Sequence, residues 1–256
     1  LVPKGPVAII DTVAGTGVPG FTGDGGPATS AKVFAPFGVA VDQQGDLLFS
    51  GDNRVRRVAA ATGVITTVAG TGSPSLEGDG GPASDAALNS PRGITVDSLG
   101  NVYIADHANA RIRRIDAQTG TISTVAGGGQ IQSGAFLQFA GEGGDAAKAV
   151  IKKPWDVAID RSNNLFIAAN DRVLRVDAGS GIISTVAGGT TATQEMTDQG
   201  FTGDGGLAVD AVLVEPRGLA VDSAGNLFIA DKGSRRVRKV DVSTGTITTL
   251  ARGKDV

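Results

Sequence analysis

The feature that most constrains the fold of this chain is a unit of about 60 residues that recurs along its 256 residues. A segment that begins with proline and ends with aspartate reads PFGVAVD, PRGITVD, PWDVAID and PRGLAVD at residues 36–42, 91–97, 154–160 and 216–222. The successive prolines are 55, 63 and 62 residues apart. Such a period indicates an array in which each copy packs against its neighbours, because one copy cannot bury its apolar face alone. We therefore predict a single domain over residues 1–256, with repeats at about 14–68, 69–125, 126–186 and 187–250.

Each repeat predicts four short strands. The first is the segment after the proline, and the second lies at 47–51, 102–106, 165–169 and 227–231. The third is rich in arginine, at 54–58, 111–115, 172–176 and 236–240, and the fourth ends each repeat, at 64–70, 121–127, 182–188 and 246–252. Turn residues separate them, since the chain has 39 Gly and its Asp outnumber its Glu by 22 to 4. The pattern indicates an all-β chain, a β-propeller of four-stranded antiparallel blades.

The motifs of these strands resemble a known repeat family. Pro-x-Gly-Val-Ala-Val-Asp is followed by Gly-Asn-Leu-Phe-Ile-Ala-Asp and Arg-Val-Arg-Lys-Val, a succession similar to the NHL repeat, and the GDGGPA insertion is similar to its long-looped bacterial form. The resemblance covers nearly the whole chain. It implies an exported propeller, extracellular or periplasmic. In function it implies a binding module that faces protein, RNA or carbohydrate or, as in some relatives, a lyase or a lactonase.

Both ends of the chain carry a segment of the fourth-strand type. The first is a leading outer strand at 7–14, and the second is the last strand of the fourth repeat. A closed ring of four blades needs only one of them. The surplus predicts that the chain is part of a larger ring, with six blades as the favoured number, or that open strand edges pair with another copy.

A glycine-rich loop links each repeat to the next. GFTGDGG occurs at 20–26 and again at 200–206, and the aligned acidic residues are Asp24, Asp79, Glu142 and Asp204. A linker from the outer edge of one blade to the inner edge of the next crosses three strand gaps of about 4.8 Å, or roughly 15 Å. We interpret the loop as a structural turn, with its carboxylate bonded to backbone N–H groups, followed by one or two helical turns. A calcium site is the alternative, although one carboxylate among glycines supplies few of the six or more oxygen ligands.

Composition argues against several classes of function. A net charge of −3, one Tyr and one Trp argue against a nucleic-acid ligand. The absence of Cys excludes a thiol nucleophile, and the single histidine, His107, excludes multi-histidine metal sites. We expect His107 to be exposed in a loop. No apolar run of about 18 residues occurs, so no membrane span is predicted.

Arginines cluster in the third strands. We interpret them as a solvated blade face that forms ion pairs with Asp in the adjacent turns. The set is Arg54, Arg56, Arg57, Arg111, Arg113, Arg114, Arg235, Arg236 and Arg238.

The residues that follow the repeat prolines form the candidate ligand-binding site: Phe37, Arg92, Trp155 and Arg217. They begin the innermost strand of every blade and should therefore surround one mouth of the central channel. Aromatic and arginine side chains there could bind a protein, a peptide or a glycan, or they could instead cover the blade interfaces. We predict a non-catalytic binding or assembly module without a catalytic residue and without a bound cofactor.

A metal-dependent lyase or lactonase is the alternative function. Its metal ligands would be carboxylates and amides, and the third repeat offers two, since Asp156 stands where the other repeats have Gly and Asn170 lies in a two-residue link. That link, 170–171, and its counterpart, 52–53, suit type I′ turns. Asp106 and Asp231 precede longer links, which we expect them to stabilise.

Overall fold

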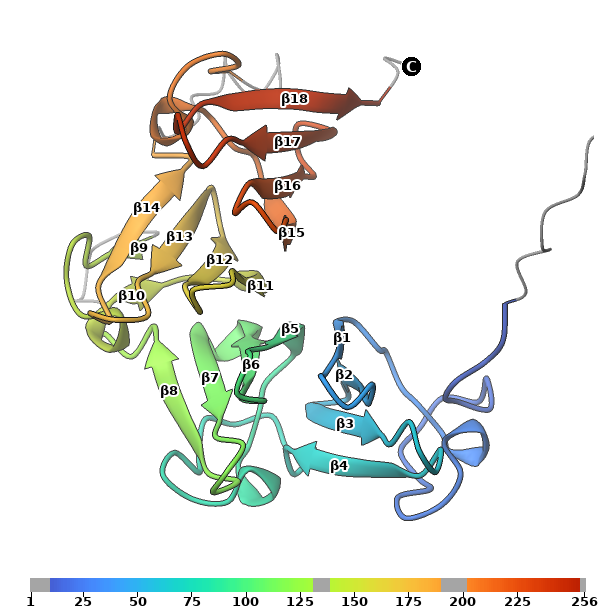
Figure 1. Cartoon of the computed structure of the whole chain (residues 1–256). Helices are drawn as coiled ribbons and strands as arrows, with labels where there is room; N and C mark the ends of the chain where they lie inside the picture. The colour runs from blue at the N-terminus through green and yellow to red at the C-terminus, as the bar shows by residue number, and fades with distance from the viewer. Residues whose placement is uncertain (1–9, 131–138, 190–201, 254–256) are drawn as a thin grey trace, which may run out of the picture.

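The computed structural model describes residues 10–130, 139–189 and 202–253 of the chain. In these residues four antiparallel sheets have four strands each, and every one of them keeps its strands in chain order. Figure 1 shows the sheets as blades along an open arc, with the first strand of each blade innermost and the fourth outermost. The predicted all-β propeller with four-stranded antiparallel blades is confirmed.

The blades contain the following strands. Blade 1 consists of β1 (Val39–Val41), β2 (Leu47–Gly51), β3 (Arg54–Val58) and β4 (Ile65–Ala69). Blade 2 consists of β5 (Pro91–Val96), β6 (Val102–Asp106), β7 (Arg111–Ile115) and β8 (Ile122–Ala126). Blade 3 consists of β11 (Pro154–Ile159), β12 (Leu165–Ala169), β13 (Arg172–Val176) and β14 (Ile183–Ala187). Blade 4 consists of β15 (Pro216–Val221), β16 (Leu227–Asp231), β17 (Arg236–Val240) and β18 (Ile247–Arg252).

Shorter elements lie between these strands. A hairpin of β9 (Phe139–Ala140) and β10 (Val150–Ile151) precedes blade 3 and was not predicted. The 3-10 turns of the described residues are η1 (Ala28–Ser30), η2 (Ala83–Asp85), η3 (His107–Asn109), η4 (Ala146–Lys148) and η5 (Ala208–Asp210). All but η3 follow a glycine-rich loop, where one or two helical turns were predicted. Of the predicted leading strand, residues 10–14 are coil, which corrects that prediction, and residues 7–9 lie outside the described residues.

The apolar core lies between neighbouring blades. Leu48 and Val55 of blade 1 share one cluster with Ile94 and Ile104 of blade 2, and similar clusters join blade 2 to blade 3 and blade 3 to blade 4. Blades 2 and 3 are therefore packed on both faces. All five residues of β12 are buried as a result, and the strand does not alternate between buried and exposed residues.

Each glycine-rich linker covers the outer edge of the blade that follows it. In blade 1, Gly25 N donates to Ile65 O at 2.8 Å, and Ile65 N donates to Gly26 O at 3.0 Å. The same pairing recurs in the other three blades, for example at Ile122 and Gly81. The backbone groups of this one residue of each outer strand are therefore not free to pair with another chain.

Glycine is required in this loop because the backbone approaches the 3-10 turn closely. Gly78 has φ +96°, and a Cβ atom there would lie 2.5 Å from Ala86 Cα. Both the left-handed backbone and the contact exclude a side chain. The repeated glycines are therefore structural, as predicted.

The loop carboxylate clamps a buried arginine of the third strand. Asp79 pairs with Arg113 at 2.8 Å and Asp204 pairs with Arg238 at 2.7 Å, and both arginine side chains are 0% exposed. Asp24 and Arg56 form the same pair in blade 1. Pairing with Asp was predicted, but a solvated face is wrong for these three arginines, because the linker covers them. Arg57 and Arg114, one residue further on, remain partly exposed.

In blade 3 the linker binds the outer strand without a buried ion pair. Leu174 stands where the other blades have the clamped arginine, and Glu142 stands where they have Asp. The longer Glu142 accepts hydrogen bonds from Thr185 N at 2.9 Å and Thr185 Oγ1 at 2.7 Å. The linker carboxylate thus binds the outer strand in every blade, with or without an arginine beneath it.

Asp106 and Asp231 stabilise the longer links, as predicted. Asp106 is fully buried and accepts hydrogen bonds from Asn89 N at 2.7 Å and Asn109 Nδ2 at 2.8 Å. Asp231 accepts one from Val214 N at 2.7 Å. Each also lies near the clamped arginine of its own blade. Among the described residues, no helix is long and apolar enough to cross a membrane.

Replacing Arg113 by leucine should lower the free energy of unfolding by about 3–5 kcal/mol, because Asp79 and the buried Asp106 then lose their cation. Urea unfolding followed by circular dichroism measures this loss. Arg114→Leu is the control. Arg114 pairs with Asp116 at the surface at 2.7 Å, so its loss should cost below about 1 kcal/mol.

A third variant tests whether the stability lost in Arg113→Leu is due to the missing ion pair or to the changed volume of the side chain. Arg113→Leu combined with Asp79→Glu and Asp106→Ala copies the set Glu142, Ala169 and Leu174 of blade 3. It should recover part of the lost stability, since no buried charge is left unpaired. If Arg113→Leu lowers the free energy of unfolding no more than Arg114→Leu does, the ion pair between Asp79 and Arg113 does not stabilise the blade.

Candidate functional site at the channel mouth

The four residues that follow the repeat prolines come together in one stack. The guanidinium carbon of Arg92 lies 4.3 Å from the ring centroid of Phe37 and 4.8 Å from that of Trp155. The guanidinium carbon of Arg217 lies 3.9 Å from the centroid of Trp155. These are cation–π distances, so side chains from all four blades form a continuous cluster, which we call the mouth cluster. Phe37 is 47% exposed and the other three are half-buried, so the cluster is open to solvent.

Ser50 of β2 fixes the backbone beneath two members of the mouth cluster. Its carbonyl oxygen accepts a hydrogen bond from Phe37 N at 2.9 Å, and its hydroxyl donates to Arg92 O in the next blade. The hydroxyl also accepts from Gly38 N at 2.9 Å. Ser50 is fully buried and occupies a position where the other blades have Ala. It ties the first residues of two inner strands together, a role that the sequence analysis did not find.

His107 extends the mouth cluster, which corrects the prediction of an exposed loop histidine. Its ring lies 4.3 Å from the Trp155 ring, and its Nδ1 lies 2.9 Å from Pro154 O. A carbonyl oxygen can only accept, so Nδ1 carries the proton. Burial lowers the pKa of His107, the bond to Pro154 opposes this, and the charges of Arg92, Lys153 and Arg217 lower it further. His107 is therefore neutral near pH 7.

The described carboxylates compensate the positive charge at the mouth only in part. Among the described residues, no carboxylate lies within 4 Å of the Arg92 guanidinium. Burial, and then the charge of Arg217, lowers the pKa of Arg92. Arg217 pairs with Glu215 at 3.2 Å, but the same carboxylate oxygen also binds Lys232 at 2.8 Å. The field at the mouth therefore favours an anion.

The channel below the mouth contains a cavity of about 360 Å³ between the inner strands of all four blades. Of the described residues, Asp156 is the one carboxylate that lines it. Its Oδ2 accepts a hydrogen bond from Leu219 N at 2.8 Å in the next blade, and its Oδ1 accepts one from Val157 N at 2.9 Å. Burial raises the pKa of Asp156 to about 6, against the opposing effect of these two bonds. Asp156 thus connects two inner strands.

Asn170 is not brought to this cavity. It opens the link between β12 and β13, with φ +58°, and does not line the channel. Only Asn170 of this link has a positive φ, so the predicted type I′ turn is wrong there, whereas Asp52 and Asn53 both have one and confirm theirs. Asp156 and Asn170 together do not form a metal site in this arrangement. Among residues 10–130, 139–189 and 202–253, no group of three or more His, Asp or Glu is placed so that it could hold a metal ion.

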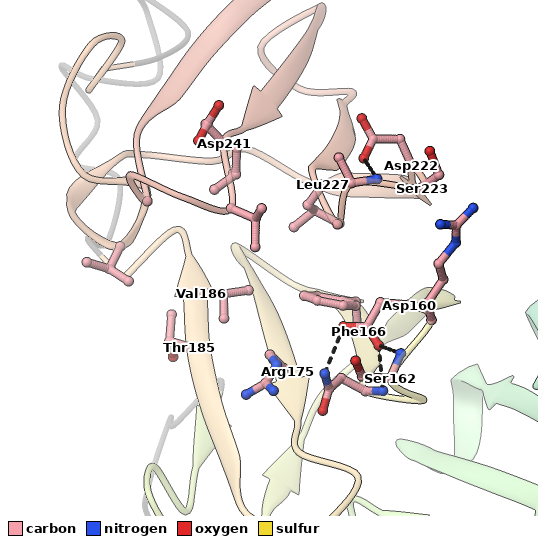
Figure 2. Close-up of a pocket in the computed structure, with 18 of the residues that line it drawn as sticks. Asp160, Ser162, Phe166, Arg175, Thr185, Val186, Asp222, Ser223, Leu227 and Asp241 are labelled. Carbon is pink, nitrogen blue, oxygen red and sulfur yellow. Dashed lines mark hydrogen bonds between the residues drawn. The ribbon is translucent and has the colours of Figure 1, made fainter.

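A second hollow, of about 680 Å³, lies between blades 3 and 4. Figure 2 shows Phe166 and Leu227 facing each other across it. Three of its lining residues, Leu207, Val209 and Val242, are larger apolar residues where blade 2 has the smaller Pro82, Ser84 and Ala117.

The acidic residues at the rim of this hollow are engaged within their own turns. Asp160, Asp222 and Asp241 accept hydrogen bonds from backbone N–H groups two residues further on, at 2.8–3.0 Å. Arg175 pairs with Asp177 at 2.9 Å. Arg161, which also lines the hollow, is exposed, whereas in the mouth cluster a half-buried arginine, Arg92, lies against two aromatic rings with no described carboxylate beside it. We therefore take the mouth cluster as the candidate functional site.

The raised pKa of Asp156 predicts how stability depends on pH. A carboxyl group whose pKa is higher in the folded chain favours folding in its protonated form, so its contribution is lost as pH rises from 3.8 through about 6. Between pH 4 and pH 7.5 the wild type should lose roughly 2–3 kcal/mol relative to Asp156→Asn, since one pKa unit corresponds to about 1.4 kcal/mol. Urea unfolding of both proteins across this range measures the difference. If the free energies of unfolding of the wild type and of Asp156→Asn differ by the same amount at every pH, the Asp156 carboxyl is not held in a desolvated site.

Comparison with known proteins places these features in a family. The family model of the Teneurin NHL domain matches residues 72–139 and 189–256, more than half of the chain. Teneurin-1 of Mus musculus is 32% identical over 231 residues, which cover 83% of this chain and 8% of that protein. The chain thus spans a small part of the length of this relative.

Two solved structures show the same fold. The Nidogen/Laminin complex matches with a TM-score of 0.52 and 16% identity, over 85% of this chain and 65% of that chain. A candidate gluconolactonase matches with a TM-score of 0.52 and 15% identity, over 85% of this chain and 63% of that chain. At these identities the likeness concerns the fold alone. With the family model, the four blades and the repeated motifs in agreement, the chain belongs to the NHL-repeat β-propellers and is similar to the NHL domain of teneurins.

Proposed function

We propose that this chain is a non-catalytic binding module that takes a protein or peptide partner at the mouth cluster. The observation that carries the proposal is the stack of Phe37, Arg92, Trp155 and Arg217, one residue from each of four blades. Trp and Arg are the side chains that most often dominate the binding energy of protein interfaces.

The stack also lowers the entropic cost of binding. An arginine that already lies against an aromatic ring, as Arg217 lies against Trp155 at 3.9 Å, loses fewer conformations when a partner arrives. Ser50 and Asp156 join the inner strands beneath it, so the side chains project from a fixed backbone. A surface with these properties is suited to recognition.

The alternative of a propeller lyase or lactonase rests on Asp156, whose pKa is raised to about 6 in the channel cavity. Two features oppose it. Both oxygens of Asp156 accept backbone hydrogen bonds, and the rest of the cavity is lined by Val, Ile, Leu, Ala and one Thr. A divalent cation there would have too few oxygen ligands from side chains.

A peptide-display library and a glycan array, both screened with the wild type, test the proposal. The variant Phe37→Ala, Arg92→Ala, Trp155→Ala and Arg217→Ala should lose at least about tenfold in affinity for the selected peptides, since several hot-spot contacts are removed together. Circular dichroism would show that the variant is folded. The control Leu207→Pro, Val209→Ser and Val242→Ala changes the hollow between blades 3 and 4 to the residues of blade 2 and should bind like the wild type.

Three results would contradict the proposal. The mouth variant could bind the selected peptides as tightly as the wild type does. The glycan array alone could give ligands. Purified wild type could hydrolyse a lactone such as gluconolactone, with activity that depends on added calcium or zinc and is lost in Asp156→Asn, in which case the chain is an enzyme.

A further inference from the structure

We propose that the mouth cluster binds a carboxylate, presented by an acidic segment of a partner polypeptide, between the guanidinium groups of Arg92 and Arg217. This inference rests on the proposed function and deepens it, because it names the chemical group that the mouth recognises. It follows from three observations. The Arg92 guanidinium lacks a described carboxylate partner, side chains already lie against the Trp155 ring, and the positive charges of the mouth all lower the pKa of His107.

The first observation is that Arg92 has no anionic partner in the part of the chain that the structure describes. Its guanidinium lies within 5 Å of two aromatic rings, with no described carboxylate within 4 Å. Its Nε is buried and makes no hydrogen bond to any described group, and the Nε of Arg217 is in the same state. A half-buried guanidinium in an apolar setting is costly, and a carboxylate that accepts from it would offset that cost.

The second observation concerns the ring of Trp155. Arg217 lies 3.9 Å from its centroid, Arg92 lies 4.8 Å from it, and His107 packs at 4.3 Å. A sugar would need a free aromatic face to stack on, and three side chains already cover this ring. Beside the exposed ring of Phe37, the mouth offers a ligand two planar guanidiniums, whose N–H groups match the two oxygens of a carboxylate. The geometry therefore favours an acidic peptide over a glycan.

The third observation is that the positive charges at the mouth lower the pKa of the same neighbouring residue, His107. Arg92, Lys153 and Arg217 each lower the pKa of His107 through their charge. An anion bound among them would cancel part of this field, and the pKa of His107 would rise. His107 is the only histidine of the chain. Its imidazole resonances therefore report on this site without ambiguity.

Glu215 is the internal competitor for the proposed ligand. It accepts from Arg217 at 3.2 Å and from Lys232 at 2.8 Å, and it is exposed. It thus occupies part of the donor capacity that a ligand carboxylate would use. Removing its charge with Glu215→Gln should tighten the binding of an acidic peptide.

The test uses the whole chain and three probes. The first is a capped peptide of alternating Glu and Gly, the second is the same peptide with Gln in place of Glu, and the third is an oligogalacturonate. Proton NMR follows the imidazole resonances of His107 from pH 4.5 to pH 8 with and without each probe. The Glu peptide should raise the pKa of His107 by about half a unit or more, and the Gln peptide should leave it unchanged.

Affinities from isothermal titration complete the test. The Glu peptide should bind at least tenfold more tightly than the Gln peptide in about 10 mM salt, and the difference should shrink at about 150 mM, where screening is stronger. Arg92→Ala should abolish the preference, and Arg92→Lys should restore only part of it, because lysine lacks the planar pair of donors. The control is Arg175→Ala, since Arg175 is paired with Asp177 at 2.9 Å and lies outside the mouth cluster.

Several results would overturn the inference. The Glu and Gln peptides could bind equally, Arg92→Ala could keep the preference, or the pKa of His107 could stay constant at saturation. Binding of the oligogalacturonate without binding of the Glu peptide would reject the acidic peptide as the source of the carboxylate. If library peptides still require the mouth cluster but carry no acidic residue, the inference fails while the proposed function stands.

Discussion

The contact between a linker carboxylate and the outer strand of a blade is the interaction on which the arrangement of the blades depends, and in three of the four blades a buried arginine pairs with that carboxylate. Asp79 reaches Arg113 at 2.8 Å from a loop that also pairs with the outer strand of the same blade. The loop starts at the outer edge of the preceding blade, so the clamp fixes one blade against the next. Breaking one partner would leave a charge without compensation in a packed seam, where the free-energy cost is high.

Blade 3 shows what the clamp is required to do. With Leu174 in place of the arginine, Glu142 still binds the outer strand through Thr185, at 2.9 Å from its backbone nitrogen. The essential element is therefore a carboxylate that accepts from the outer strand, and the arginine is one way to occupy the space beneath it. Because a linker pairs with the outer strand of all four blades in a similar way, the inner strands begin at one rim, and their first side chains meet there.

Much of this fold was predictable from the sequence, and the reasons are physical. The strands follow from β-branched segments between turn residues, and the blade order follows from the repeat alone. The structural role of the glycine loop was also predictable, because a linker must cross the width of a blade. The meeting of Phe37, Arg92, Trp155 and Arg217 at one mouth followed from their shared place after the repeat prolines, which begin three of the inner strands and shortly precede β1. Their role in ligand binding stays a prediction.

Features that depend on contacts between blades could not be predicted from the sequence of a single repeat. The burial of Arg113 was missed because both faces of a blade are covered, so alternation along a strand does not mark the solvent side. The placement of His107 against Trp155 depends on a contact between two blades. One signal was available and unused: Glu142, Ala169 and Leu174 depart together from the other repeats, which indicates that these positions lie in contact.

The most direct test of the account is an experimental structure of the chain with the acidic peptide bound. It should show carboxylate oxygens within about 3 Å of guanidinium nitrogens of both Arg92 and Arg217, with both groups still against the Trp155 ring. A peptide seated in the hollow between blades 3 and 4, or stacked on Trp155 with the arginines displaced, would contradict it.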